Sequence, residues 1–111
     1  MRASPELILR ISSIRRATPA TRIVQLALDG QRFDFKAGQA ALIGPAGRHE
    51  RVPYSLACAP EEARRKGCLE FLIRVETSGR WGHLFDRLAR GMRIGVRGPL
   101  GSFVIPDSGP A

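Results

Sequence analysis

The sequence predicts an all-β fold, a six-stranded antiparallel Greek-key barrel with one short helix. Short apolar segments of strand length recur along the chain, and turns containing glycine or proline separate them. Helical spacing of apolar side chains is confined to one segment, 83–90. The length of 111 residues leaves room for a single domain with one modest core.

The expected strands follow one another from the N-terminus. They are 7–14, 21–28, 40–43, 52–57, 69–76, 93–97 and 102–105. The pair Asp29-Gly30 predicts a turn after the second strand, and Pro53 inside the fourth predicts a bulge or a sheet edge. The charged stretch 60–67 is expected to be an exposed excursion. Leu69 to Val75 is the strongest strand, because its alternate apolar residues share one face.

The short helix is expected at 83–90, where Leu84, Phe85 and Leu88 recur at helical spacing and Gly91 ends the segment. It would cap one end of the barrel. Residues 1–105 are expected to form the barrel domain, and 106–111 to be a linker, because proline and glycine dominate that tail.

Charge and composition narrow the classes of function. The formal net charge is +8 and 16 of the 18 basic residues are arginine, which favours anionic partners such as nucleic acid, an acidic protein or a phosphate-bearing cofactor. No apolar run is long enough to span a membrane and the start does not resemble a signal peptide, so a cytoplasmic location is expected.

Several kinds of catalytic site find no support in the residues. The two histidines, His49 and His83, lie in unlike contexts, and Cys58 and Cys68 show no metal-ligand spacing or disulfide framework, so no metal site is predicted. There is no phosphate-binding P-loop, no dinucleotide glycine fingerprint and no nucleophile matched to a histidine. Hydrolase and metalloenzyme functions are therefore disfavoured.

Two clusters carry side chains or backbone suited to binding. Arg51, Pro53, Tyr54 and Ser55 combine a guanidinium for a phosphate with an aromatic ring and a hydroxyl for a flat heterocycle. The second cluster, 79–83, opens the expected helix, where free N–H groups receive diphosphates. Each cluster taken alone is also compatible with a purely structural role. A third, glycine-rich stretch, 91–103, has no reactive group and is expected to be scaffold.

The order and spacing of these clusters resemble the FAD-binding domain of the ferredoxin–NADP⁺ reductase superfamily over nearly the whole chain. Its aromatic-x-x-Gly-Gln feature corresponds to Phe35-Lys-Ala-Gly38-Gln39, and the Tyr-Ser of its flavin motif to Tyr54-Ser55. A strand like 69–75 follows, then a Gly-x-x-Ser-type loop with a short helix, then a Gly-Pro-x-Gly-x-Phe turn at 98–103.

The resemblance implies FAD as the cofactor, with FMN as the alternative, and a role for each matched residue. Tyr54 would lie against the isoalloxazine, and Ser55 would hydrogen-bond its reactive N5–O4 edge, which makes this pair the expected catalytic residues. The backbone of Ile73, Arg74 and Val75 would line the flavin and ribityl chain. Arg80, Trp81, Gly82 and His83 would hold the pyrophosphate, with Arg51 and Pro53 completing the cofactor site.

The chain departs from the family pattern at two positions. The family arginine stands two residues before the tyrosine, where this chain has Val52, and Arg51 stands three before it. Because side chains alternate along a strand, Arg51 should point to the other face unless Pro53 introduces a bulge. Gly82 replaces the family's Ser or Thr and loses one hydroxyl, which Arg80 could offset.

The implied function is that of an FAD-binding module relaying electrons between NAD(P)H and an acceptor such as a ferredoxin or flavodoxin. The nucleotide would be bound by a separate domain or subunit expected after Ile105, and an acidic electron-transfer protein would suit the basic surface. Two other hypotheses remain open. The shifted Arg51 and Gly82 favour a flavin-free interaction barrel. The charge favours, less strongly, a nucleic-acid-binding barrel, although the seven aromatic residues are mostly assigned to the core.

Overall fold

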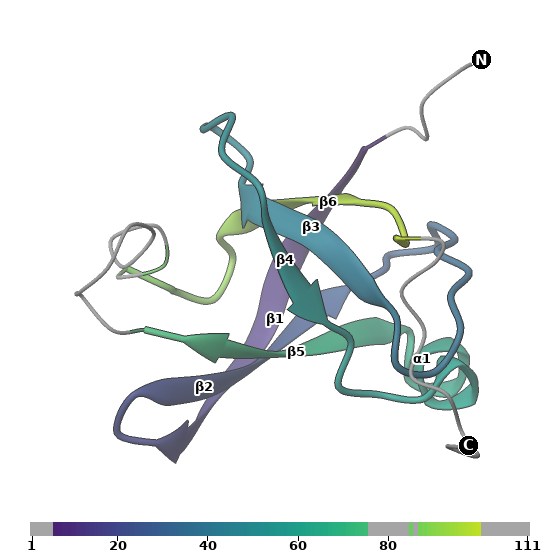
Figure 1. Cartoon of the computed structure of the whole chain (residues 1–111), viewed down its shortest axis with the longest axis horizontal. Coiled ribbons are helices and arrows are strands. Elements are labelled where there is room, and N and C mark those ends of the chain that lie inside the picture. The colour runs from purple at the N-terminus through teal and green to yellow at the C-terminus, as the bar shows by residue number, and fades with distance from the viewer. Residues whose placement is uncertain (1–5, 76–84, 86, 101–111) are drawn as a thin grey trace.

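The structure, a computed structural model, describes residues 6–75, 85 and 87–100. Six strands form one antiparallel sheet in the order β4-β3-β6-β1-β2-β5 (Figure 1). The elements are β1 Leu7–Thr18, β2 Thr21–Ala27, β3 Ala40–Pro45, β4 Val52–Ser55, α1 Pro60–Lys66, β5 Cys68–Arg74 and β6 Arg93–Arg97. The predicted all-β class and the six antiparallel strands are thus confirmed. The expected strand 102–105 and the boundary after it lie outside the described residues.

The prediction of a closed Greek-key barrel is wrong, because β4 and β5 are the two edges of the sheet. In the described part of the chain, a single bridge between Leu56 and Phe71 connects these edges. β4 is only four residues long and Pro53 has no N–H to donate to a ladder. The predicted strand 52–57 therefore ends at Ser55, and the sheet curls without closing (Figure 1).

The helix is also not where the spacing predicted it. Of 83–90, the structure describes residues 85 and 87–90, which form turns and irregular backbone. The helix α1 instead occupies the expected excursion, with Pro60 at its start and Gly67 as a left-handed C-cap at φ 72°. Glu61 and Glu62 in its first turn and three basic residues in its last complement the helix dipole.

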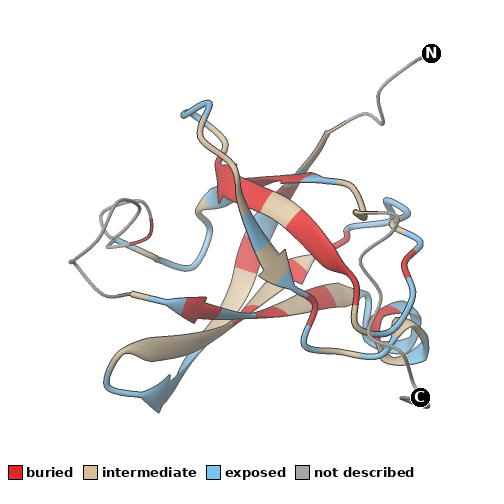
Figure 2. Ribbon diagram, in the orientation of Figure 1, coloured by how far each residue is buried: buried red, intermediate tan, exposed pale blue. Residues whose placement is uncertain are grey.

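The core lies on the inner face of the curled sheet, where buried residues alternate with exposed ones along the strands (Figure 2). Cross-strand pairs of β2 and β5 are buried together, for example Val24 opposite Phe71. A register shift between Ile11 and Ser13 marks a bulge in the pairing of β1 with β2, and β1 pairs with β6 on its other side through residues 7–10. The turn predicted at Asp29-Gly30 is present, with φ 51° and 83°.

Candidate functional site

Strand β4 places Tyr54 and Ser55 at one edge of the sheet. It pairs with β3 in an unbroken register, Ala41 opposite Tyr54 and Ala40 opposite Ser55. The half-buried Tyr54 packs against the hydrophobic core, while Ser55 is exposed on the other side of the strand. The aromatic ring is thereby held by protein contacts, and the hydroxyl beside it is accessible to a ligand.

The ring of Tyr54 is oriented by a residue that the sequence analysis assigned only to a helix face. Phe85 is buried, and its ring lies edge-on to that of Tyr54, with centroids 5.9 Å apart and an interplanar angle of 73°. Nothing in the sequence pattern links these two aromatic residues. The contact exists because the chain returns from β5 to the open edge of the sheet before β6 begins.

The second edge strand, β5, contributes the other predicted residues that are described. The side chain of Ile73 is buried in the core, so this residue can offer a ligand only its backbone. Arg74 is exposed. The N–H of Val75 donates to the carbonyl of Ala20 at 2.9 Å, which leaves its carbonyl and side chain for other contacts.

The bridge between Leu56 and Phe71 brings the predicted residues of the two edges together. On the β4 side this bridge comes one residue after Ser55, and on β5 it comes two residues before Ile73. A hollow of about 230 Å³ lies next to this region, lined by Ile14, Arg22, Val75, Phe85 and Leu88. The predicted residues Arg80, Trp81, Gly82 and His83 lie outside the described residues.

Arg51 does not join Tyr54 and Ser55. The regular β3–β4 register contains no bulge at Pro53, so the strand does not return Arg51 to the face of Tyr54. Its guanidinium instead forms an ion pair with Glu6, and Glu6 also pairs with Arg97 at 3.0 Å. The alternation argument thus identified the direction of this side chain, but the sequence held no signal for its partner.

Two carboxylates near Arg51 have pKa values below the usual 4.5. Hydrogen bonding to Arg51 is the main cause that lowers the pKa of Glu6; partial burial opposes it, and hydrogen bonding to Arg97 adds to the lowering. The pKa of Glu50 is lowered to about 2 by its hydrogen bonds to Arg48. Both groups are therefore ionised at neutral pH and compensate part of the dense positive charge.

Gln39, from the aromatic-x-x-Gly-Gln feature, connects two of the recognised sequence motifs. Its side-chain oxygen accepts from the N–H of Lys36 at 2.7 Å, and its amide donates to the carbonyl of Leu100 at 3.2 Å. Its own carbonyl accepts from the N–H of Leu56. The glutamine thus ties the loop before β3 to the turn after β6 and to the end of β4, which explains why it is buried.

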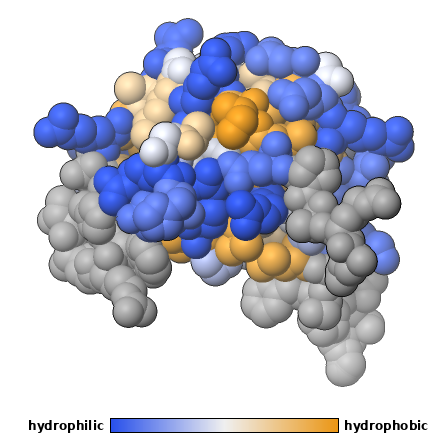
Figure 3. Space-filling view, turned by 90° about the horizontal axis from the view of Figure 1, so that it is seen from above, coloured by the Kyte–Doolittle hydropathy of each residue, from blue (hydrophilic) through white to orange (hydrophobic). Residues whose placement is uncertain are grey.

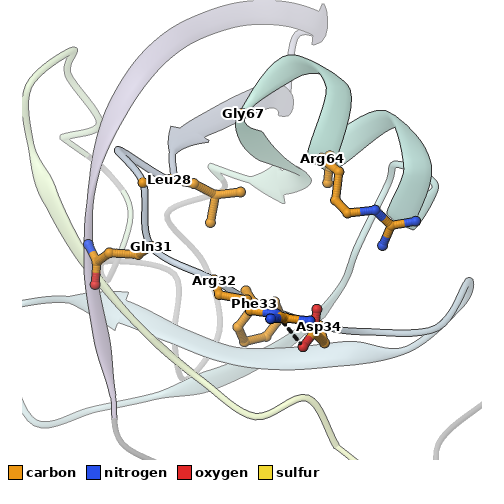
Figure 4. Close-up of a pocket in the computed structure, with 9 residues that line it drawn as sticks. Leu28, Gln31, Arg32, Phe33, Asp34, Arg64 and Gly67 are labelled. Atoms are coloured by element: carbon orange, nitrogen blue, oxygen red, sulfur yellow. Dashed lines mark hydrogen bonds and ion pairs between the residues drawn. The ribbon is translucent and has the colours of Figure 1, made fainter.

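A separate pocket of about 400 Å³ opens between α1 and the chain after β2, and none of the predicted site residues that the structure describes lines it (Figure 4). Its lining combines an apolar floor with a few charged groups: Leu28, Gly30, Gln31, Arg32, Phe33, Asp34, Ala63, Arg64 and Gly67. Arg32 is paired with Asp34 at 2.9 Å. The volume of a pocket therefore does not indicate where the residues that match the family motifs lie.

Much of the surface in view is hydrophilic, with a small apolar patch enclosed by polar side chains when seen from above (Figure 3). Among the residues that the structure describes, the large apolar side chains that are exposed are Ile8 and Leu72. No helix in that part of the chain is long and apolar enough to cross a membrane. A group of three metal-ligating side chains is likewise absent from it.

The structure thus shows an open antiparallel sheet with Tyr54 and Ser55 on its edge strand β4, and comparison with known proteins shows the family. Residues 8–105 match the oxidoreductase FAD-binding domain family. The chain therefore belongs to this family, and FAD is its cofactor.

Among individual proteins, the chain is 35% identical over 98 residues to methane monooxygenase component C of Methylosinus trichosporium, covering 81% of this chain and 28% of that protein. It is 36% identical over 94 residues to the reductase component of propane 2-monooxygenase of Mycolicibacterium goodii, covering 80% and 26%. The crystal structure of an Amycolatopsis cytochrome P450 reductase superposes with a TM-score of 0.71 at 34% identity, covering 92% and 31%. The chain thus spans less than a third of these relatives.

The described residues fit a flavin at the edges of β4 and β5. Tyr54 offers a half-buried ring on one side of β4, Ser55 an exposed hydroxyl on the other, and β5 the backbone of an edge strand, which are groups that suit a flat heterocycle with a polar rim. Arg51 is the exception, because its guanidinium is engaged by Glu6 and by backbone carbonyls.

Proposed function

We propose that this chain is the flavin-holding part of an NAD(P)H-dependent reductase that passes electrons to a protein acceptor. The observation that carries the proposal is the pairing on β4 of a core-held aromatic ring with an exposed hydroxyl, in a chain of this family. When bound, the flavin supplies the redox chemistry, since it accepts a hydride and gives up electrons.

The residues of the chain bind and orient the cofactor. Tyr54, fixed by its edge-on contact with Phe85, offers a ring face to the isoalloxazine. Ser55 donates a hydrogen bond to the N5–O4 edge, and the backbone of residues 73–75 lines the ribityl side. Pro53 keeps β4 at the sheet edge because it cannot donate to a neighbouring strand. These assignments depend on the resemblance together with the meeting of β4 and β5.

For the pyrophosphate we propose the segment Arg80, Trp81, Gly82 and His83. The supporting argument is chemical: glycine lets a phosphate approach backbone N–H groups, and Arg80 adds a planar fork of donors. Since the guanidinium of Arg51 is engaged elsewhere, Arg80 would be the more important cation for FAD.

The electron donor and acceptor are proposed by class. Positioning a nicotinamide needs a nucleotide-binding domain or subunit, and the relatives are more than three times longer than the matched segment. The acceptor is proposed to be an acidic electron-transfer protein, such as a ferredoxin or flavodoxin, or an oxygenase component. The net charge of +8 would accelerate its association.

A flavin titration tests the proposal directly. The chain, stripped of flavin, is titrated with FAD and with FMN, and binding is followed by quenching of flavin fluorescence. We expect saturable binding with preference for FAD, and a roughly fivefold weaker Kd in Tyr54→Ala, equivalent to about 1 kcal/mol of stacking. Absence of saturable binding would overturn the proposal.

Phe33→Ala is the matched control, because it removes another half-buried ring. Phe33 lies in the loop after β2, and the centroid of its ring is 6.1 Å from that of Phe35. Its Kd for FAD should equal that of the parent. Equal weakening in both variants would mean that loss of any aromatic ring loosens the fold, and would count against a specific role for Tyr54.

A further inference from the structure

We propose that Arg51 is a positioning residue: with Glu6 and Arg97 it forms a clamp on the outer face of the sheet that fixes the start of β4, and it does not contact the cofactor. We call these three residues the clamp. The importance of β4 rests on the proposed function, since this strand carries Tyr54 and Ser55. The internal contacts of the clamp do not depend on it.

The two terminal nitrogens of the Arg51 guanidinium are occupied by contacts within the protein, while its buried Nε has no hydrogen-bond partner among the described residues. Its Nη1 donates to three backbone carbonyls, those of Pro45 at 3.3 Å, Arg48 at 2.7 Å and Glu50 at 2.7 Å. Its Nη2 donates to Oε2 of Glu6. The side chain is only 9% exposed. Both terminal nitrogens are therefore engaged, and a phosphate approaching them would meet the Glu6 carboxylate.

A pair of glycines makes room for this ion pair. Gly44 on β3 stands directly opposite Gly95 on β6, and the neighbouring pair Ile43 and Val96 is fully buried in the core. By alternation the glycines face outward, yet both are buried, because the clamp covers them. A Cβ on Gly95 would overlap the Glu6 carboxylate and lie 2.5 Å from Nη2 of Arg51.

Glu6 connects the clamp to two further strands. Its position just before β1 sets it opposite Arg97 on β6, in line with the register of Leu7 and Val96. Oε1 accepts from Arg97 at 3.0 Å while Oε2 accepts from Arg51. A single carboxylate, 21% exposed, therefore links β1 and β6 to the loop that leads from β3 into β4.

This link matters because β4 has little else to hold it. The strand is four residues long, pairs with β3 on one side only, and contains a proline. The guanidinium of Arg51 holds the carbonyls of residues 45, 48 and 50 together. These hydrogen bonds set the geometry of the backbone just before Val52, where β4 begins. The clamp thereby fixes the strand that carries Tyr54 and Ser55, and it lies on the face opposite to the ring of Tyr54.

The test compares Arg51→Gln, Glu6→Gln and the double variant, first without flavin. If the clamp exists, each single variant lowers the Tm of the flavin-free chain by roughly 5–10 °C, and the double variant lowers it little further, because the two residues act as one unit. Arg10→Gln is the matched control: its pair with Asp29 is about half exposed, and its loss should shift the Tm by about 0–3 °C. Additive shifts no larger than that of the control would overturn the proposal.

The second readout is the Kd for FAD. If Arg51 is a positioning residue, Arg51→Gln and Glu6→Gln should weaken FAD binding to the same modest extent, about two- to fivefold. If Arg51 instead bound a phosphate of FAD, Arg51→Gln would weaken the affinity for FAD at least tenfold. Glu6→Gln keeps the arginine and removes a competing carboxylate, so this variant would then bind FAD as well as the parent or better. That pattern would refute the clamp.

The two readouts also separate this inference from the proposed function. If the parent chain binds no flavin, the proposed function fails, while the Tm coupling between Glu6 and Arg51 still decides whether the clamp exists. Should Arg51→Gln not fold, Glu6→Gln alone suffices, because a lowered Tm with weaker FAD binding supports the clamp and an unchanged Tm with tighter binding contradicts it.

Discussion

Arg51 and Ser55 are four residues apart but belong to opposite environments. Arg51 is nearly buried, and both of its terminal nitrogens donate to groups of the same chain. Ser55 is exposed, beside a ring that the core and Phe85 hold in place. Polar groups whose hydrogen bonds are satisfied internally stabilise a fold, whereas accessible ones on a rigid support are suited to binding. The strand joins a structural end to a ligand-facing end.

The two ends also differ in what holds them. The Arg51 end depends on a charge pair in a partly desolvated place, where loss of Glu6 would leave the guanidinium of Arg51 without its charged partner. The Tyr54 end depends on apolar packing that reaches down to β5. Substitutions that disturb one end and spare the other can therefore distinguish structural from ligand-facing contributions.

The largest effect is expected from Phe71→Ala, which removes a fully buried ring under the bridge that joins the two sheet edges. The cavity should reduce the free energy of unfolding by about 3–5 kcal/mol, measured by denaturant titration of the flavin-free chain. FAD binding should weaken as well, since β4 loses its link to β5. Leu72→Ala next to it, 49% exposed, should cost less than about 1 kcal/mol. Similar losses in both variants would contradict the assigned core.

Gly95→Ala should come second, because its Cβ displaces the carboxylate of Glu6 from Arg51. We expect a loss of about 2–4 kcal/mol in the free energy of unfolding, comparable to breaking a partly buried ion pair. Gly47→Ala is the control, since a Cβ there meets nothing within 4 Å. The comparison of the two ends would lose its basis if Gly95→Ala were as stable as Gly47→Ala.

At the ligand-facing end, Ser55→Ala should leave the stability of the fold unchanged. It should change the rate of flavin reduction more than the retention of flavin. Loss of one neutral hydrogen bond corresponds to about 1 kcal/mol. We expect the rate of flavin reduction by NAD(P)H, measured anaerobically once a nucleotide-binding domain or subunit is supplied, to fall roughly fivefold or more, with a smaller change in Kd for FAD. Equal reduction rates in the variant and the parent would remove Ser55 from the catalytic pair.

The smallest expected effect is a dependence of stability on pH in the acid range. Because Arg51 and Arg97 lower the pKa of Glu6, its ionised form contributes stability that is fully present above pH 4.5 and is lost as the pH falls through the lowered pKa. The stability difference between the parent and Glu6→Gln should therefore be widest above pH 4.5 and narrow in acid. Unfolding curves at several pH values measure this, and a difference independent of pH would show that Glu6 is not ionised in the clamp.

The positions of the strands were predictable because alternation of apolar side chains is a local property. All six described strands, 7–18, 21–27, 40–45, 52–55, 68–74 and 93–97, begin within one residue of the expected positions. Alternation predicted that Arg51 points away from the face of Tyr54 unless Pro53 introduces a bulge, and the regular β3–β4 register contains no such bulge. The helix was misplaced because two apolar spacings in 83–90 outweighed the end signals of 60–67, Pro60 and Gly67, which are equally local.

What the sequence by itself determined is thus the class of fold, most strand positions and the residues of the family motif. Only the tertiary structure decided that the sheet stays open, that Phe85 orients Tyr54, and that Arg51 is held by Glu6 over two facing glycines. The physical reason is distance along the chain. Periodicity and turn chemistry act among neighbouring residues, whereas these contacts join residues far apart in sequence, which meet only when the whole sheet has assembled.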